Sequence, residues 1–294
     1  MDGVTFDIHK GETLGLVGES GSGKTTTARV ILHLLPPTAG EVYFRGRDVL
    51  TIKDKNELRE FRRKMQIIFQ DPYEYLSPRK TVQQILAEPL KLYRLASGDE
   101  LLSRVEETLE LVELTPPGAF LGKYPHELSG GQRQRVLVAR PLLLNPDFVV
   151  ADEPVSMIDI SIRIGILNLL LRLREKYNLT CLFITHDLAI ARYVCNRIAV
   201  MYMGKIVEIG PAESVITDPV HPYSKALVSA VPVPNPRDRN PVVVVREALI
   251  GSLDTLSGCR FHPRCPYAIA GCDRQEPELR EVKRNHFVAC HLAT

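Results

Sequence analysis

The sequence predicts an α/β fold with a largely parallel sheet, and one pattern that occurs three times indicates it. In each case a short apolar run is followed at once by polar residues: 13–17 precedes a glycine-rich loop, 148–151 precedes Asp152 and Glu153, and 181–185 precedes His186. Short apolar runs bounded by polar residues are typical of buried strands. Because open α/β sheets bind ligands at the carboxyl ends of their strands, we expect these polar residues to mark the functional site.

The first polar segment is a phosphate-binding loop. Residues 18–25 read Gly-Glu-Ser-Gly-Ser-Gly-Lys-Thr, which fits the pattern G-x-x-x-x-G-K-[ST]. The glycines let backbone N–H groups approach phosphate oxygens, Lys24 neutralises the β and γ phosphates, and the Thr25 hydroxyl reaches Mg²⁺. Residues 24–35 predict a helix that Pro36 and Pro37 terminate. The alternative, a glycine-rich turn that matches by chance, is disfavoured by the strand and helix on either side.

Two carboxylates and a histidine follow the other two predicted strands. Asp152 can hold Mg²⁺ through water, and Glu153 beside it can orient or activate the water that attacks a phosphate. His186 on its own would be more simply interpreted as a strand-end histidine with satisfied hydrogen bonds. Its position beside the other two polar sites favours a functional role.

Between Gln70 and Ser129 the pattern changes to that of helices. Ser97 and Glu100 match a capping box, which predicts a helix start. The apolar residues that follow recur at spacings of three and four, as one buried stripe does: Leu102, Val105, Leu109 and Val112. We therefore expect a helical insert between the two halves of the nucleotide-binding core.

A second capping box, Ser-Gly-Gly-Gln, begins at Ser129. Its glycines leave the first N–H groups of the following helix uncovered, which makes a second anion site. One chain cannot easily direct both sites at one phosphate, so a head-to-tail pair of subunits is the economical arrangement. An ordinary capped surface helix is the alternative, and without the other motifs it would be preferred.

Together these motifs resemble those of ATP-binding-cassette (ABC) ATPases, and more narrowly the second ATPase subunit of bacterial oligopeptide and dipeptide importers. The broad resemblance is carried by 18–25, Gln70 in Ile-Ile-Phe-Gln-Asp-Pro, the signature 128–132, 152–154, 156–159 and 185–187. The narrower one is carried by 124–127, 132–135, 221–223 and the cysteine-bearing tail. The resemblance implies a P-loop NTPase fold of the ABC cassette type, with a RecA-like core. It implies a nucleotide-binding domain over 1–220, a helical subdomain over about 71–140, and a small cysteine-bearing extension over 221–294.

The resemblance also implies roles for individual residues. Glu153 is the general base, His186 the γ-phosphate switch, and Gln70 the residue that senses Mg²⁺ and couples to membrane subunits. Mg²⁺ is held by Thr25, Gln70 and Asp152, and Asp159 makes the contact across the dimer. The residues expected to contact the nucleotide are Gly18, Glu19, Ser20, Gly21, Ser22, Gly23, Lys24, Thr25, Thr26, Gln70, Asp152, Ser129, Gly130, Gly131, Gln132 and Asp159. The loop near Tyr73, Tyr75 and Leu76 would receive a helix from a membrane subunit, unless these residues simply pack against the insert.

Three features depart from the family pattern. The aromatic residue that stacks on adenine would fall before Met1, so the chain looks shortened at its start, and we expect weaker ATP binding than in an extended version. Pro141 interrupts the helix after the signature, where an interior proline costs about 3 kcal/mol. Met157 and Ile158 replace a smaller and a similar apolar residue in the dimer-contact loop.

After a proline-rich stretch, 231–241, that predicts a linker, four of the six cysteines lie near the C-terminus: Cys259, Cys265, Cys272 and Cys290. In a chain without a secretion signal, clustered cysteines bind metal more often than they form disulfides. Zinc sites usually begin with closer pairs, whereas four thiolates suit a [4Fe–4S] cluster. The resemblance implies the same, since some peptide-importer ATPases carry such a cluster in this extension. Zinc and free thiols are the alternatives.

The composition is that of a globular enzyme that contacts a membrane only through partners. The net charge of +2 is too small to indicate a nucleic-acid partner, and no apolar run approaches the roughly 18 residues that cross a bilayer. The resemblance implies a position on the cytoplasmic face of the inner membrane. Its partners would be a homologous ATPase subunit in a heterodimer, two transmembrane permeases and an extracytoplasmic solute-binding protein. The alternatives are a soluble ABC-type ATPase acting on DNA or ribosomes, a regulatory cassette that barely hydrolyses ATP, and an importer of nickel or another small solute.

Overall fold

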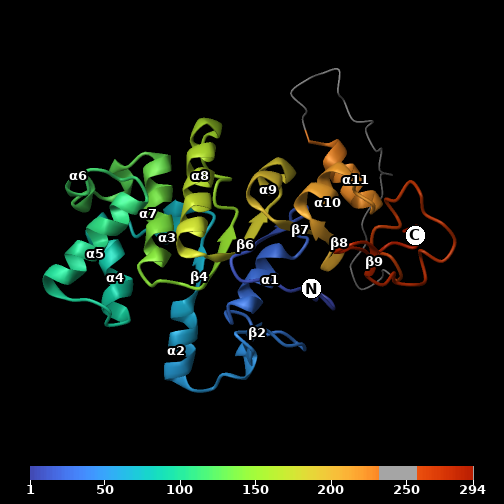
Figure 1. Cartoon of the computed structure of the whole chain (residues 1–294), viewed down its shortest axis with the longest axis horizontal. Helices are drawn as coiled ribbons and strands as arrows, with labels where there is room; N and C mark the ends of the chain where they lie inside the picture. The colour runs from blue at the N-terminus through green and yellow to red at the C-terminus, as the bar shows by residue number, and fades with distance from the viewer. Residues whose placement is uncertain (232–256, 294) are drawn as a thin grey trace. The chain divides into compact units, whose positions relative to one another are not determined.

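The chain forms two compact units in a computed structural model that describes residues 1–231 and 257–293 (Figure 1). Unit 1 comprises Met1–Ile8, Glu12–Thr27 and Phe183–Thr294, and unit 2 comprises His9–Gly11 and Ala28–Leu182. Two elements, α1 (Lys24–Ile31) and β6 (Thr180–Thr185), contribute residues to both units. All but the first residue of the predicted linker, 231–241, lies outside the described residues.

Unit 1 is built on a mixed sheet whose strands follow the order β1-β7-β8-β10-β9. Strand β1 (Thr13–Val17) is fully buried and lies parallel to β7 (Arg197–Tyr202), with Leu14 opposite Arg197. Strand β7 forms an antiparallel hairpin with β8 (Lys205–Pro211). The C-terminal strands β9 (Arg280–Lys283) and β10 (His286–Val288) are antiparallel to each other, and β10 pairs with β8. The cysteine-bearing extension is therefore continuous with the sheet that carries β1.

Three short helices complete unit 1: α9 (Leu188–Val194), α10 (Ala212–Thr217) and α11 (Pro222–Ser229). Figure 1 shows α10 and α11 in orange beside β8. The helix predicted over 24–35 ends earlier than expected, at Ile31. Its last turn closes because His33 adopts a left-handed backbone, with φ of 52°, and Leu34 donates its N–H to the Arg29 carbonyl.

A buried carboxylate joins the extension to this sheet. Glu208 of β8 has no exposed surface, and its oxygens accept hydrogen bonds from the backbone N–H groups of Val220 and His221, both at 2.9 Å. His286 of β10 approaches the same carboxylate through Nε2, at 2.7 Å. Because a buried charge is costly unless it is hydrogen-bonded, these contacts fix β10 and the start of α11 on β8.

His221 begins α11 from a buried position. Its Nδ1 accepts a hydrogen bond from the backbone N–H of Tyr223 at 3.0 Å, which caps the helix. Burial lowers the pKa of His221 to about 4, although the Glu208 carboxylate opposes this shift. The ring is therefore neutral in the folded protein.

Unit 2 contains a second pair of parallel strands and most of the helices. Strand β4 (Met65–Ile68) lies beside β5 (Phe148–Asp152), with Met65 opposite Phe148. The remaining elements are the hairpin β2 (Tyr43–Phe44) and β3 (Arg47–Asp48), the 3₁₀ helices η1 (Val49–Thr51) and η2 (Pro125–Glu127), and the helices α2 (Lys55–Lys64), α3 (Pro72–Tyr75), α4 (Val82–Leu92), α5 (Gly98–Leu111), α6 (Gly118–Leu121), α7 (Gly130–Leu142) and α8 (Ile160–Tyr177). Figure 1 shows α4, α5 and α6 gathered beside α7, where they bury a common apolar core.

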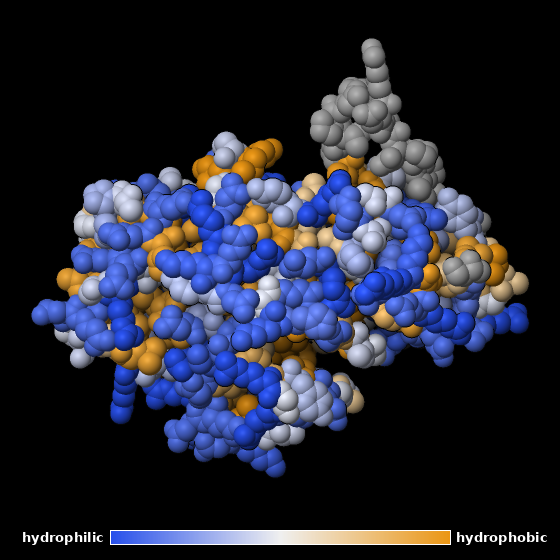
Figure 2. Space-filling view, in the orientation of Figure 1, coloured by the Kyte–Doolittle hydropathy of each residue, from blue (hydrophilic) through white to orange (hydrophobic). Residues whose placement is uncertain are grey.

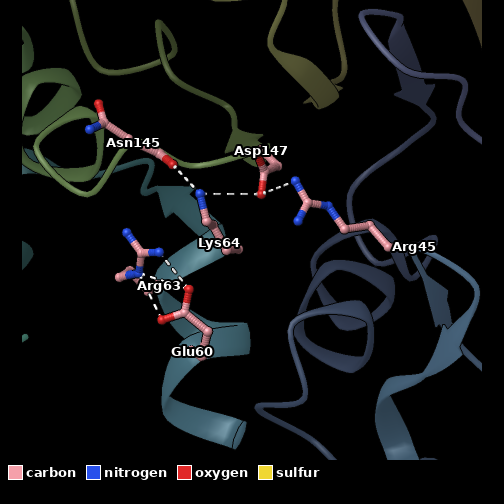
Figure 3. A network of polar contacts seen from close by, with 6 residues as sticks. All are labelled: Arg45, Glu60, Arg63, Lys64, Asn145 and Asp147. Atoms are coloured by element: carbon pink, nitrogen blue, oxygen red, sulfur yellow. Dashed lines mark hydrogen bonds and ion pairs between the residues drawn. The ribbon is translucent and has the colours of Figure 1, made fainter.

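Ion pairs hold the amino ends of β4 and β5 together (Figure 3). Asp147, directly before β5, lies 2.8 Å from the Arg45 guanidinium and 3.6 Å from Lys64 Nζ, and Figure 3 shows the two cations reaching it from different segments. Lys64 also donates to the Asn145 carbonyl at 3.2 Å, and Asp147 N–H donates to the Lys64 carbonyl at 2.9 Å. Partly exposed pairs contribute about 1 kcal/mol or less each. Their effect is to support the register that sets where β4 and β5 end.

Two details of the predicted helical insert are wrong. Ser97 precedes α5, but its side chain makes no capping hydrogen bond, and Glu100 instead lies 2.7 Å from Arg104. The buried stripe begins at Leu101 rather than Leu102, because position 101 is four residues before Val105 and lies on the face of α5 that packs into the helical core.

Pro141 is buried within the last turn of α7, and the helix ends one residue later. Leu143 then donates its N–H to the carbonyls of Ala139 and Pro141. A proline so close to the helix end forfeits its own N–H bond without disturbing a following turn. The position of Pro141 near the helix end therefore explains why a proline is tolerated there, which the helical pattern of the sequence did not explain.

We predict that His221→Asn changes how stability depends on pH. An unfolded chain protonates this histidine below its ordinary pKa of 6.5, whereas the folded protein holds it neutral down to about 4. The wild type should therefore lose up to about 3 kcal/mol of unfolding free energy through this group as the pH falls through that window. Asparagine keeps a capping oxygen and does not titrate. Urea unfolding at about pH 7 and about pH 5 checks this, and equal pH dependence in both proteins would contradict it.

Candidate functional site

The phosphate loop, 18–25, connects β1 to α1 in unit 1, as its sequence predicts. Gly21 and Gly23 have φ angles of +80° and +106°, which side-chain-bearing residues rarely adopt. A Cβ on Gly18 would lie 2.1 Å from the Met201 carbonyl oxygen, so only glycine lets the chain leave β1 directly over β7. The loop thus exposes backbone where a phosphate-binding loop requires it.

Lys24 closes the loop on itself. Its Nζ donates to the carbonyl oxygens of Gly18 at 2.8 Å and Glu19 at 2.9 Å, and only 6% of the residue is exposed. The N–H of Ser22 also donates to the Glu19 carbonyl, at 3.2 Å. A buried ammonium beside a loop of backbone donors at a helix start is an arrangement that fits the phosphates of a nucleotide.

Other predicted residues of unit 1 lie at the ends of α1 and β6. Thr25 and Thr26 are exposed in the first turn of α1, and His186 is exposed directly after β6. Asp187 beside it accepts hydrogen bonds from the N–H groups of Ala189 and Ile190, which begins α9. The hydroxyls of Thr25 and Thr26 therefore reach the surface at the start of α1, and the His186 imidazole reaches it at the end of β6.

In unit 2, three predicted residues meet at the carboxyl ends of β4 and β5. Asp152 is the last residue of β5 and is 7% exposed. Glu153 follows it, and its carboxylate accepts a hydrogen bond from Gln70 Nε2 at 3.2 Å. Glu153 adopts a left-handed backbone with φ of 46°, which costs a residue with a Cβ about 1–2 kcal/mol. Such strain concentrates at functional sites, and Ser156 helps to hold it by donating to the Glu153 carbonyl.

The signature segment begins α7 as predicted. The Ser129 hydroxyl accepts from the Gln132 N–H at 3.3 Å, and the Gln132 side chain accepts from the Ser129 N–H at 3.0 Å. A Cβ on Gly131 would lie 2.6 Å from Ile162 of α8, so this glycine allows the two helices to approach closely. Gly130 is the first residue of α7. Asp159 is exposed directly before α8, and its side chain does not cap that helix.

Of Tyr73, Tyr75 and Leu76, only Tyr73 is exposed, and docking of a membrane-subunit helix at this loop stays a prediction. Leu76 is 1% exposed, and the Tyr75 ring stacks on Phe69 with centroids 3.6 Å apart, so both pack against the helical core. Tyr73 is 65% exposed and carries the Arg133 guanidinium 4.0 Å from its ring centroid. Among these three apolar and aromatic residues, Tyr73 is therefore the one at the surface.

The four C-terminal cysteines are free thiols that lie near one another in unit 1. Cys259 donates its backbone N–H to the Cys272 carbonyl at 2.8 Å, and Cys265 and Cys272 are buried. Burial, together with the nearby Cys290, Cys272 and Cys265, raises the pKa of Cys259 to about 11. Within residues 1–231 and 257–293, no group of three or more cysteine, histidine or acidic residues is arranged to hold a metal ion. The predicted [4Fe–4S] ligation therefore gains no support.

Comparison with known proteins decides the family. A model described as "ABC transporter" matches residues 1–156, and one described as "Oligopeptide/dipeptide transporter, C-terminal region" matches residues 207–272. The oligopeptide transport ATP-binding protein AppF of Bacillus subtilis is 44% identical over 294 residues, which is 99% of this chain and 89% of AppF. OppF of the same organism is 47% identical over 292 residues, with 99% and 89% covered.

The chain belongs to the ABC transporter family. Solved structures share its cassette fold. A dimeric ATP-binding cassette in a post-hydrolysis state, bound to ADP and Pi, matches with a TM-score of 0.63 and 36% identity, over 71% of this chain and 89% of that one. A component of the ABC transporter complex cbiONQ from Clostridium perfringens matches with a TM-score of 0.65 and 25% identity, over 74% and 83%. No helix in the described part of this ABC cassette is both long and apolar enough to cross a membrane.

We predict that Gly18→Ala weakens ATP binding. The added methyl group would meet a backbone carbonyl, so the loop must shift, at a cost of about 1–3 kcal/mol. Gly122→Ala is the matched control, because nothing lies within 4 Å of its Cβ position. Titration with a fluorescent ATP analogue and thermal denaturation measure both effects. Equal nucleotide affinity in the wild type and Gly18→Ala would contradict the close packing described for Gly18.

Proposed function

We propose that this ABC cassette is the ATP-hydrolysing subunit of an importer of oligopeptides or dipeptides. The observation that carries the proposal is that one chain joins an ABC transporter region to a C-terminal region of the oligopeptide/dipeptide transporter type. The names of AppF and OppF support the same cargo class. A soluble ATPase acting on DNA or ribosomes would have the nucleotide motifs without this C-terminal region.

ATP binds to the phosphate loop in this proposal. The backbone donors of residues 18–25 and the Lys24 ammonium hold the phosphates, which the positive φ angles of Gly21 and Gly23 support. Thr25, Gln70 and Asp152 would hold Mg²⁺, since hydroxyl, amide and carboxylate oxygens are the donors that this hard cation prefers. When bound, Mg²⁺ would supply positive charge that offsets the charge of the phosphates during transfer.

Hydrolysis depends on Glu153 in this account. Its carboxylate takes the proton from the water that attacks the γ-phosphate, and the Gln70 amide N–H, 3.2 Å away, orients it. His186 contacts the γ-phosphate. The left-handed backbone of Glu153 supports a functional placement, since nothing in local helix or strand geometry requires it.

A second ATPase subunit completes the site by presenting its signature segment to this chain's nucleotide. In the reciprocal arrangement, this chain's own signature segment, Ser129 to Gln132, and its Asp159 act at the nucleotide that the partner subunit binds. Exposed apolar side chains support such an interface: Met157 is 59% exposed, Ile160 76% and Ile164 59%. Figure 2 shows hydrophobic atoms at the upper end of α8, where an adjoining subunit would cover them.

The further partners in this proposal are a homologous ATPase, two transmembrane permeases and an extracytoplasmic solute-binding protein. The chain contacts the cytoplasmic face of the membrane through the permeases. Tyr73, beside Arg133, is the exposed aromatic residue of the 73–76 segment and is available to the permeases. Closure of the ATPase pair on ATP drives the permeases, and hydrolysis resets them.

The test is Glu153→Gln in the assembled importer. This change keeps the side-chain size and the contact to Gln70 but removes the base, so ATP turnover should fall by about a hundredfold or more while ATP remains bound. Glu175→Gln, an exposed carboxamide substitution on α8, is the control and should be neutral. Phosphate release, retained nucleotide and oligomeric state by light scattering are measured together. Turnover near the wild-type rate in Glu153→Gln would show that the base is wrongly assigned.

A further inference from the structure

The C-terminal extension reaches the phosphate loop through Glu19, the second residue of that loop. Arg264 Nη1 lies 3.0 Å and 3.3 Å from the two carboxylate oxygens of Glu19. The backbone N–H of Glu19 donates to the Tyr223 hydroxyl at 2.9 Å. The side chain and the main chain of one loop residue are thus both held by residues at least 200 positions later in the sequence. All of these residues belong to unit 1.

Arg264 rests on a buried aromatic base, which fixes its position. Tyr202, Tyr223 and Phe261 are 2%, 1% and 1% exposed. Their ring centroids are 4.6 Å, 5.2 Å and 5.4 Å apart in pairs. The Arg264 guanidinium carbon lies 5.9 Å from the Tyr202 centroid and 6.0 Å from that of Phe261, within the range of cation–π attraction. A side chain held on such a base loses little further rotamer entropy when it pairs with Glu19.

The turn that carries Arg264 lies between Cys259 and Cys265 and is itself closed by backbone hydrogen bonds. His262 N–H donates to the Cys259 carbonyl at 3.0 Å, and Cys265 N–H donates to the His262 carbonyl at 3.2 Å. Arg264 N–H donates to the Phe261 carbonyl at 3.0 Å. The turn therefore presents Arg264 from a fixed backbone.

Glu19 in turn controls the group that faces the nucleotide. Its carbonyl accepts hydrogen bonds from Lys24 Nζ at 2.9 Å and from Ser22 N–H at 3.2 Å. A displaced Glu19 would move the acceptor that holds Lys24. Its carboxylate also lies within the loop that receives phosphates, where an unpaired negative charge would repel them, and the Arg264 cation offsets that charge.

We propose that Arg264 and Tyr223 are positioning residues that hold Glu19 in place, so that the phosphate loop and Lys24 stay ready for ATP. This inference rests on the proposed ATPase function. It assigns the C-terminal extension a part in the nucleotide site, and it gives the Tyr223 of the His-Pro-Tyr segment a role that its sequence did not disclose. Loss of this support should weaken nucleotide binding more than it slows the chemical step, because neither side chain is placed at the attacking water.

The experiment measures KM for ATP, kcat and melting temperature of the full-length chain in its assembled complex. Arg264→Gln should raise KM about fivefold, the effect of losing a partly exposed ion pair, with kcat within about twofold of wild type. Arg264→Lys should restore part of the affinity, since it restores the charge without the planar fork. Arg280→Gln is the control: Arg280 belongs to the same extension, is 75% exposed and pairs with Glu278.

Two further variants separate positioning from simple structural support. Tyr223→Phe keeps the ring and removes the hydroxyl, so KM should rise while the aromatic base remains. In Glu19→Gln, Arg264→Gln should have a smaller effect than in the wild type, because the charge that it offsets is already absent.

Three results would overturn the inference. KM unchanged in Arg264→Gln while the wild type binds ATP would mean that the extension does not position the loop. A lower melting temperature without a change in KM would make Arg264 a structural contact only. If Arg264→Gln raised KM equally in the wild type and in Glu19→Gln, the ion pair between Arg264 and Glu19 would be excluded as the cause of the rise. Failure of the wild type to bind ATP would instead reject the proposed function.

Discussion

The nucleotide loop depends on one steric constraint, the absence of a side chain at Gly18. The chain leaves β1 so close to the Met201 carbonyl of β7 that no Cβ fits. This path brings Glu19 to Tyr223 and lets Lys24 fold back onto the carbonyls of Gly18 and Glu19. The loop is consequently held on one side by its own lysine and on the other by residues from the C-terminal part of unit 1.

The carboxylate of Glu208 attaches the C-terminal extension to the sheet of unit 1. It is fully buried and bonds to two backbone N–H groups and to His286, so β10 and α11 both depend on one carboxylate of β8. Because α11 carries Tyr223, this network also determines where the hydroxyl that meets Glu19 lies. Sheet, extension and phosphate loop are thus linked by hydrogen bonds within a single unit.

The sequence was sufficient to predict features that depend on local pattern. Strands β1, β5 and β6 appeared as apolar runs because most of their residues are buried, and Ser129 to Gln132 formed the predicted capping box because cap and helix are adjacent in the chain. Features set by tertiary packing were missed. Glu19 and Arg264, whose side chains pair, are 245 positions apart, and the cysteine spacing did not determine how the thiols are arranged in space. For Tyr75 the sequence left docking and packing open, and its stacking on Phe69 is the packing alternative.

The central claim is that this ABC cassette powers a membrane importer of peptides. Affinity purification of the full-length chain from its native membranes, with the accompanying chains identified by mass spectrometry, tests it most directly. The account predicts two permeases, a homologous ATPase and a solute-binding protein whose ligand is a peptide. Ribosomal or DNA-repair proteins in place of permeases would contradict it.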